Sequence, residues 1–248
     1  MTETFATREG QRVPDVAFRI RRNGDWETLA TGDIFAGRNV VVFSLPGAFT
    51  PTCSSTHLPR YNELAPVFRA HGIDEIVCIS VNDPFVMEEW AKDQEADNVL
   101  LVPDGNGEFT ARMGMLVDKS DLNFGKRSWR YSMLVRDGKI EKMFIEPREP
   151  GDPFKVSDAD TMLDYINPKA RRPDQVAILT REGCAFCAKA KAKLADAGYD
   201  YVEIPLSHAI RTKAIGAIAG AQTVPQVFIN GRLVGGANEL EAYLRKAA

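Results

Sequence analysis

The sequence lacks a long hydrophobic run, since none of its apolar stretches approaches the ~18–20 residues that a helix needs to cross a bilayer. It also lacks an excess of one charge, with 31 basic and 34 acidic residues and a formal net charge of -3. That balance argues against a protein that mainly coats nucleic acid or anionic lipid. The first ten residues show no basic segment leading into an apolar core. We therefore expect no secretory signal, no membrane partner and a cytosolic protein.

Cysteine and histidine are scarce, with four and three residues in a chain of 248. Cys184 and Cys187 form a C-x-x-C pair, and no histidine lies at a short spacing from them. A structural zinc site needs about four Cys or His ligands, so we predict no metal site. In a reducing cytosol such a pair, or an isolated cysteine at a turn, is more often a redox group than a structural disulfide. Thiol redox chemistry is the better interpretation.

A segment rich in proline and cations divides the chain. Residues 167–173 hold two prolines and three cations, and their largest apolar side chain is that of Ala170. Such a stretch neither continues a helix nor buries itself. We predict a first domain over 1–166, a linker over 167–173 and a second domain over 174–248.

The first domain alternates buried strands with helices. Apolar runs predict strands at 39–45, 75–81, 99–102, 131–135 and 139–145. Helical patterns lie at 53–71, 84–94 and 158–166. The alternation indicates an α/β fold with parallel strands, and Asp137-Gly138 between the last two runs predicts a hairpin, so the sheet is mixed.

The second domain repeats this scheme in miniature, in the order βαβαββα. Strands are expected at 175–180 and 201–204, with a hairpin over 226–234 around Asn230-Gly231. Helices are expected at 185–197, 209–219 and 239–246. The C-x-x-C pair opens the first helix, which is the context in which it indicates a thioredoxin-like redox site rather than a metal site.

Cys53 is placed where a thiol becomes reactive. It follows the predicted strand 39–45 and opens the predicted helix, so it meets the positive end of the helix dipole and free backbone N–H groups. Gly47 allows a small substrate to approach the backbone. From spacing alone, a buried cysteine in an ordinary strand-to-helix turn is an equally good interpretation.

The eight residues from Pro46 to Cys53, P-G-A-F-T-P-T-C, resemble the peroxidatic motif of the peroxiredoxins. Thr-His-Leu-Pro at 56–59 and Ser-Val-Asn-Asp at 80–83 are similar to the peroxiredoxin 5 branch, and the similarity runs over nearly all of 3–166.

This resemblance implies that Cys53 is the peroxidatic thiolate and that Thr50 holds the peroxide through its hydroxyl group. It implies that Arg130 stabilises the thiolate and the charge on the departing oxygen, and that Pro46 shields the sulfur from bulk water. The implied reaction is attack of the thiolate on the O–O bond, which gives a sulfenic acid and water or an alcohol.

The first domain has no evident resolving cysteine. Cys78 lies in the middle of an apolar run and is expected to be a packed core residue. Some relatives carry a resolving cysteine near the end of the domain, where this chain has Gly-Asp-Pro-Phe-Lys-Val-Ser at 151–157. His57 is an acid/base candidate by position, but packing at a helix or subunit contact is the preferred interpretation.

The second domain places three features together. Cys184 is expected just ahead of its helix, exposed, with the helix dipole and Arg181 favouring the thiolate. Thr-Val-Pro-Gln at 223–226 indicates a cis bond beside the site, and Val-Gly-Gly-Ala-Asn-Glu at 234–239 offers a helix start suited to a carboxylate.

Together these features resemble a glutaredoxin, across essentially all of 174–248. The resemblance implies that Cys184 is the nucleophile and Cys187 the resolving thiol. The glutathione-binding residues that it implies are Arg181, Thr223, Val224, Pro225, Gly236, Asn238 and Glu239. Ala185-Phe186 replaces the commoner Pro-Tyr, and Asn238-Glu239 differs from the frequent Ser/Asp-Asp pair.

The whole chain therefore resembles the bacterial hybrid peroxiredoxin–glutaredoxin proteins, which implies an α/β chain of two thioredoxin-fold domains. The implied activity is glutathione-dependent reduction of hydrogen peroxide and organic hydroperoxides, with glutathione as reducing co-substrate and no bound cofactor. Glutathione reductase is an indirect partner through oxidised glutathione, nucleic acid is not a partner, and a homo-oligomer is expected. Two alternatives are a protein deglutathionylase with the large domain as a redox sensor, and a binding protein in which Cys184 and Cys187 ligate a metal or cluster bridging two chains.

Overall fold

A computed structural model describes residues 5–22, 24–207, 210 and 212–247. The chain forms two compact units, Met1–Arg171 and Arg172–Ala248, each of which is described by itself. None of the helices within the described ranges is long and apolar enough to span a membrane. The linker bounds of 167–173 stay a prediction.

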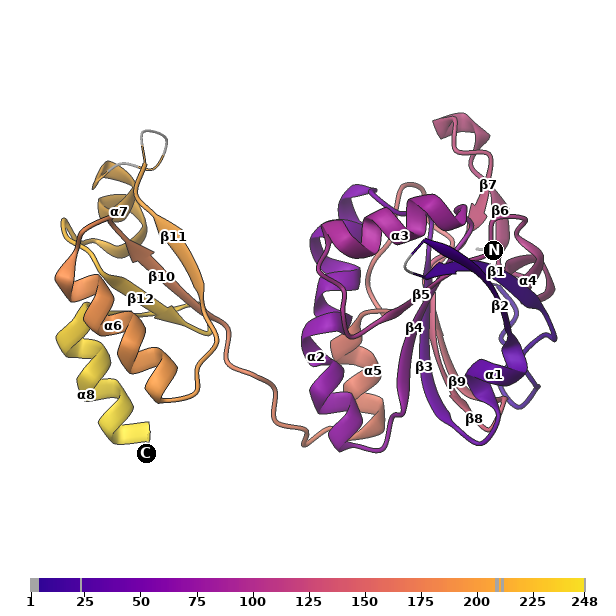
Figure 1. Ribbon diagram of the computed structural model, residues 1–248, viewed down its shortest axis with the longest axis horizontal. Helices are drawn as coiled ribbons and strands as arrows, with labels where there is room; N and C mark the ends of the chain where they lie inside the picture. Colours follow the sequence, from indigo (N-terminus) through magenta and orange to yellow (C-terminus); the bar gives the residue numbers. More distant parts are fainter. Residues whose placement is uncertain (1–4, 23, 208–209, 211, 248) are drawn as a thin grey trace. The chain divides into compact units, whose positions relative to one another are not determined.

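The large unit is built on a mixed five-stranded sheet (Figure 1). The strand order is β5 (Leu100–Pro103), β4 (Glu75–Ser80), β3 (Asn39–Leu45), β8 (Tyr131–Arg136) and β9 (Lys139–Ile145). Strands β3, β4 and β5 are parallel, while β8 runs antiparallel to β3 and to β9. The α/β class and the mixed sheet predicted from the sequence are confirmed.

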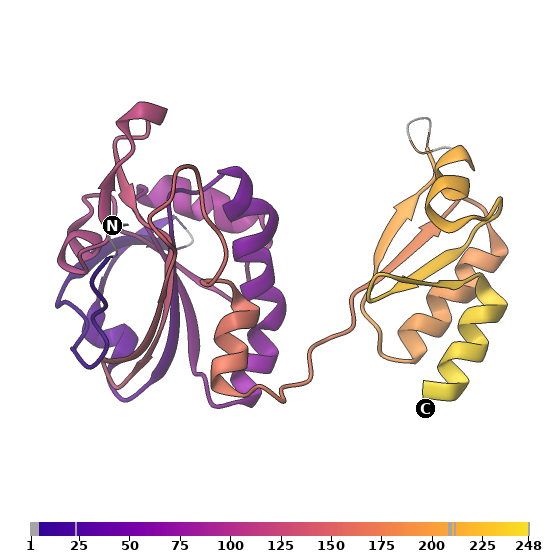
Figure 2. The same ribbon diagram turned by 180° about the vertical axis from the view of Figure 1, so that it is seen from behind.

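Each face of this sheet is covered by its own hydrophobic cluster. Alternate residues of β3 point to opposite faces, with Val41, Phe43 and Leu45 on one and Val40 and Val42 on the other. The first face packs against α2 (Leu58–Ala70), α3 (Pro84–Asp93) and α5 (Ala159–Ile166). The second packs against β1 (Ala17–Arg22), α1 (Thr31–Phe35) and α4 (Glu108–Arg112), as Figures 1 and 2 show. Burial on both faces explains the continuous apolar runs in the sequence.

The predicted helix from Cys53 consists of two parts. A five-residue π-helical turn, η1 (Cys53–His57), precedes α2. The predicted hairpin is present, since β8 and β9 pair through Asp137 and Gly138, whose φ angles are 47° and 71°. Positive φ at both central residues is what a two-residue turn between twisted strands requires.

Smaller elements were not anticipated from the sequence. They are two antiparallel pairs, β1 with β2 (Asp25–Ala30) and β6 (Leu116–Asp118) with β7 (Lys126–Ser128), a short 3-10 turn η2 (Ser120–Leu122), and helices α1 and α4.

The small unit has a four-stranded sheet in the order β11 (Val202–Pro205), β10 (Val176–Thr180), β12 (Gln226–Ile229) and β13 (Arg232–Gly235). Its helices are α6 (Ala185–Asp196), α7 (Thr212–Ala219) and α8 (Ala237–Ala247). The predicted hairpin around Asn230-Gly231 is confirmed, and α8 begins two residues earlier than expected. The predicted start of the second helix at residue 209 lies outside the described residues.

Candidate redox sites

Cys53 lies at the junction between the central strand of the large unit and the helix that covers it. Pro46 directly follows β3 and is buried, and the chain then turns through Phe49, which is exposed and has a φ of 59°. The hydroxyl group of Thr50 donates to the carbonyl oxygen of Gly47 at 2.8 Å. The Cys53 side chain is 0% exposed. Cys53 is therefore buried, and it lies at the start of a helix, where the helix dipole is positive.

Arg130 contacts Cys53 from the N-terminal end of β8, the strand next to β3. It immediately precedes β8, is 1% exposed, and its Nη2 donates to the Cys53 sulfur at 3.5 Å. The same nitrogen donates to both carboxylate oxygens of Asp152 at 2.6 Å. Burial, the largest influence, disfavours the charged form, but Cys53 and Asp152 outweigh it, so the pKa of Arg130 lies above its ordinary value. The arginine is therefore a permanent cation against the sulfur.

His57 forms a hydrogen bond with the other terminal nitrogen of Arg130. Its Nδ1 lies 2.9 Å from Arg130 Nη1, and its Nε2 lies 3.2 Å from the carbonyl oxygen of Ser157. Arginine only donates, so Nδ1 is the acceptor and Nε2 carries the proton. Burial, followed by the charge of Arg130, lowers the pKa of His57 well below its usual value. The packing role expected for His57 is thus combined with a hydrogen bond to the arginine of the site.

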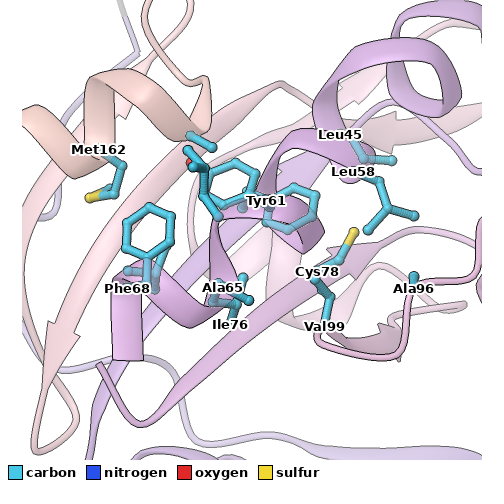
Figure 3. Close-up of a cluster of buried hydrophobic side chains, with 14 of the residues drawn as sticks. Leu45, Leu58, Tyr61, Ala65, Phe68, Ile76, Cys78, Ala96, Val99 and Met162 are labelled. Atoms are coloured by element: carbon cyan, nitrogen blue, oxygen red, sulfur yellow. The ribbon is translucent and has the colours of Figure 1, made fainter. Parts of the chain in front are cut away.

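Cys78 is a core residue, as predicted. It lies on β4 within the cluster on the α2 side, together with Leu58, Tyr61 and Val99 (Figure 3). Burial, and then the nearby Cys53, raise the pKa of the Cys78 thiol well above its usual value. A thiol that resists ionisation in a closed core is a poor nucleophile.

The C-x-x-C pair of the small unit opens α6. Cys184 is the N-cap residue, and its sulfur accepts a hydrogen bond from the Cys187 N–H at 3.2 Å. The two sulfurs lie at disulfide-bonding distance, with Cα atoms 5.2 Å apart. Cys187 is buried, one turn inside the helix, whereas Cys184 is half-buried. Cys184 is therefore the thiol that a substrate reaches first.

Cys184 opens into a cavity of about 410 Å³. The seven residues proposed for glutathione all line it, namely Arg181, Thr223, Val224, Pro225, Gly236, Asn238 and Glu239. The Val224–Pro225 bond is cis, as predicted, and the Val224 carbonyl oxygen lies 3.9 Å from the Cys184 sulfur. The cavity thus brings the Cys184 sulfur, a cation and a carboxylate together.

Sequence reasoning missed the rest of this lining and two contacts of the first site. The additional lining residues are Phe186, Leu206, Thr212, Ile215, Gln222 and Ala237. Gln222 adjoins the Thr-Val-Pro segment, which was a usable signal, and Phe186 lies between the two cysteines. Asp152 and the Arg130–His57 contact had no such signal, because they arise from residues far apart in the chain. Among the described residues, no group of three or more His, Cys, Asp and Glu side chains is placed to hold a metal ion.

A helix-start cysteine beside a buried arginine, and a C-x-x-C pair on a second thioredoxin-type unit, together define a thiol-based oxidoreductase. The Redoxin family pattern matches residues 8–163 and the Glutaredoxin pattern matches residues 176–234. The hybrid peroxiredoxin hyPrx5 of Haemophilus influenzae is 57% identical over 239 residues, which cover 96% of this chain and 99% of that protein. The chain belongs to the Redoxin family and is a peroxiredoxin–glutaredoxin fusion, an oxidoreductase of the thiol peroxidase class.

Solved structures resemble the large unit. Reduced Prx3 from Vibrio vulnificus in complex with H2O2 is 36% identical, covers 65% of this chain and 99% of its own, and has a TM-score of 0.61. The antioxidant protein of Plasmodium falciparum, a 1-Cys peroxiredoxin, is 32% identical, covers 66% of this chain and 100% of its own, and has a TM-score of 0.62. These similarities agree with a thioredoxin-like fold for the large unit.

Proposed function

We propose that the chain is a glutathione-dependent peroxidase in which the glutaredoxin domain regenerates the peroxidatic Cys53. One observation carries this proposal. Of the other three cysteines, Cys78 is sealed in the core of the large unit, whereas Cys184 opens into a cavity lined by the residues proposed for glutathione. The thiol that reduces Cys53 therefore comes from outside the large unit, and the chain carries a domain suited to supply it.

In the first step the Cys53 thiolate attacks the nearer oxygen of a hydroperoxide. The S–O bond forms as the O–O bond breaks, and the departing oxygen takes up one proton and leaves as water or an alcohol. Arg130 stabilises both the thiolate and the charge on the departing oxygen, and Thr50 binds the peroxide. Pro46 shields the sulfur from bulk water.

The following steps return Cys53 to its thiolate. Glutathione condenses with the sulfenic acid, which releases water and forms a mixed disulfide on Cys53. Cys184 attacks the glutathione sulfur, so that Cys53 leaves as thiolate and Cys184 carries the glutathione. A second glutathione then displaces oxidised glutathione from Cys184. Alternatively, Cys187 displaces reduced glutathione, and two glutathione molecules reduce the resulting Cys184–Cys187 disulfide to give oxidised glutathione. The net reaction consumes one hydroperoxide and two molecules of glutathione, and yields an alcohol or water, water and oxidised glutathione.

The cavity beside Cys184 is suited to glutathione. The Arg181 guanidinium supplies a charge for a glutathione carboxylate, and the 223–225 segment supplies backbone groups for pairing with the peptide. Asn238 and Glu239, at the start of α8, are suited to the γ-glutamyl end. We propose no resident cofactor or metal, a homo-oligomeric and cytoplasmic protein, hydrogen peroxide and organic hydroperoxides as substrates, and glutathione reductase as an indirect partner.

Trapping the mixed disulfide tests the order of these steps. In a Cys184→Ser/Cys187→Ser chain treated with one equivalent of hydroperoxide and then glutathione, intact-mass analysis is expected to show one glutathione, located on Cys53 by peptide mapping. A matched Cys53→Ser/Cys184→Ser/Cys187→Ser chain is expected to show none. Failure to glutathionylate Cys53, with activity of the full chain only toward existing glutathione mixed disulfides, would instead make the protein a deglutathionylase.

A further inference from the structure

One nitrogen of Arg130 serves three acceptors in the first site. Its Nη2 lies 3.5 Å from the Cys53 sulfur and 2.6 Å from each carboxylate oxygen of Asp152. The sulfur and the carboxylate are therefore within about 6 Å of one another, a range in which charges affect each other's ionisation strongly. The thiolate thus shares its cation with a second anion.

Asp152 lies in the segment formed by residues 147–157. Glu146 is 1% exposed and fixes the far end of this segment, because its carboxylate accepts hydrogen bonds from the N–H groups of Lys155, Val156 and Ser157. Phe154 packs its ring over the Arg130 guanidinium, with 5.4 Å from Cζ to the ring centroid. The Asp152 side chain is 41% exposed, so this edge of the site opens to solvent.

The groups around the guanidinium differ in charge and in origin. Cys53 and the neutral His57 contact the guanidinium from η1, and Asp152 contacts it from the 147–157 segment. Cys78, on β4, interacts with it electrostatically but without a hydrogen bond. His57 carries no charge, and the carboxylate of Asp152 contacts Arg130 directly. When Cys53 becomes a sulfenic acid, the arginine loses its thiolate counterion but keeps Asp152. A buried cation without any partner would be strongly destabilising, and Asp152 prevents that state.

We propose that Asp152 is a positioning residue for the reaction of Cys53: it fixes the Arg130 guanidinium against the sulfur and offsets part of its charge throughout the cycle. The proposal rests on the proposed function of Cys53 as the peroxidatic thiolate. The Asp152 carboxylate then has two separable effects. The orientation of the Arg130 guanidinium depends on an acceptor oxygen at this position, and the balance of its charge depends on the negative charge of the carboxylate.

Two substitutions separate these effects. Asp152→Asn keeps an acceptor for Nη2 and removes the negative charge, so the pH profile of Cys53 alkylation by iodoacetamide is expected to move about one unit to lower pH. Asp152→Ala removes the acceptor as well, and the rate of Cys53 oxidation by hydrogen peroxide is expected to fall at least about tenfold. Glu149→Gln, which removes an exposed charge from the same segment, is expected to match the parent chain in both measurements.

Both measurements use the full chain with Cys184→Ser and Cys187→Ser, so that the thiols of the small unit do not react in place of Cys53. Unfolding curves confirm that each variant is folded at the pH values compared. An unshifted alkylation profile in Asp152→Asn, together with an oxidation rate in Asp152→Ala within twofold of the parent, would overturn the proposal. Failure of the parent chain to react with peroxide would instead refute the proposed function, and the alkylation profiles would still decide the role of Asp152.

Discussion

A fully buried arginine is tolerated only if its charge is matched, and the two terminal nitrogens of Arg130 both have partners, although its Nε has none among the described residues. Nη2 of Arg130 donates hydrogen bonds to Cys53 and Asp152, and Nη1 donates to His57. The histidine contributes an acceptor without a charge, because burial, and then the charge of Arg130, lower the pKa of His57. The guanidinium is therefore held from both sides while its positive charge faces the sulfur.

The neutral state of His57 predicts a pH dependence of stability. Its pKa is lowered on folding, so below the unfolded value of about 6.5 the unfolded chain binds one more proton than the folded chain. The stability linked to this group is fully present above that pH and is lost as the pH falls, by up to about 1.4 kcal/mol per pH unit.

His57→Asn removes the titrating ring, so the variant is expected to lose less stability than the parent between pH 7 and pH 5.5. Urea unfolding followed by tryptophan fluorescence measures this, and Trp26, Trp90 and Trp129 all lie in the large unit. Equal losses in the variant and the parent would show that His57 is not held neutral.

Local sequence predicted the candidate reactive residues but not the residues that contact them. Cys53 and Thr50 lie in a motif of eight residues, and Arg130 matches a family position. Their geometry depends on long-range contacts, since Arg130 is 73 positions from His57 and 77 from Cys53. Nothing local to Asp152 indicates that its carboxylate meets a buried arginine.

At the scale of elements, the 147–157 segment has no regular structure of its own and depends on Glu146. One oxygen of this buried carboxylate accepts from the Val156 and Ser157 N–H groups and from the Ser157 hydroxyl group, and the other accepts from the Lys155 N–H. The Glu146 N–H also donates to the Arg130 carbonyl oxygen at 3.1 Å. These hydrogen bonds thereby join the segment that carries Asp152 to the N-terminal end of β8, where Arg130 lies.

Glu146→Gln replaces one of these acceptors with a donor, which would face a backbone N–H group. We expect the free energy of unfolding of the large unit to fall by roughly 1–3 kcal/mol, the usual cost of an unsatisfied buried group. Urea midpoints followed by tryptophan fluorescence measure the change, and Glu149→Gln serves as the exposed control. A loss no larger than that of the control would show that Glu146 does not hold the segment.

The elements best predicted were those with the strongest patterns. Strands β3 and β4 are covered on both faces, so their apolar runs were unambiguous. The β1–β2 pair was missed because β2 is exposed along most of its length and its apolar signal is weak. Its Asn23-Gly24 dipeptide was a usable turn signal. The π-helical turn at Cys53 has the same composition as an ordinary helix start, so sequence patterning does not distinguish the two.

At the scale of the whole molecule, the proposed cycle gives a reason for two redox domains to share one chain. In the proposed cycle the mixed disulfide on Cys53 is a substrate for Cys184, and covalent linkage raises the effective concentration of the two sites for one another. In that cycle the fused domain supplies the thiol that returns Cys53 to its reduced form.

The most direct test of this account is NADPH consumption in the presence of hydroperoxide, glutathione and glutathione reductase, without thioredoxin. The account predicts steady turnover by the full chain, none by Cys53→Ser, and a strongly reduced rate for Cys184→Ser. Full activity of Cys184→Ser would mean that glutathione reduces Cys53 without the fused domain. Absence of turnover by the full chain would contradict the account as a whole.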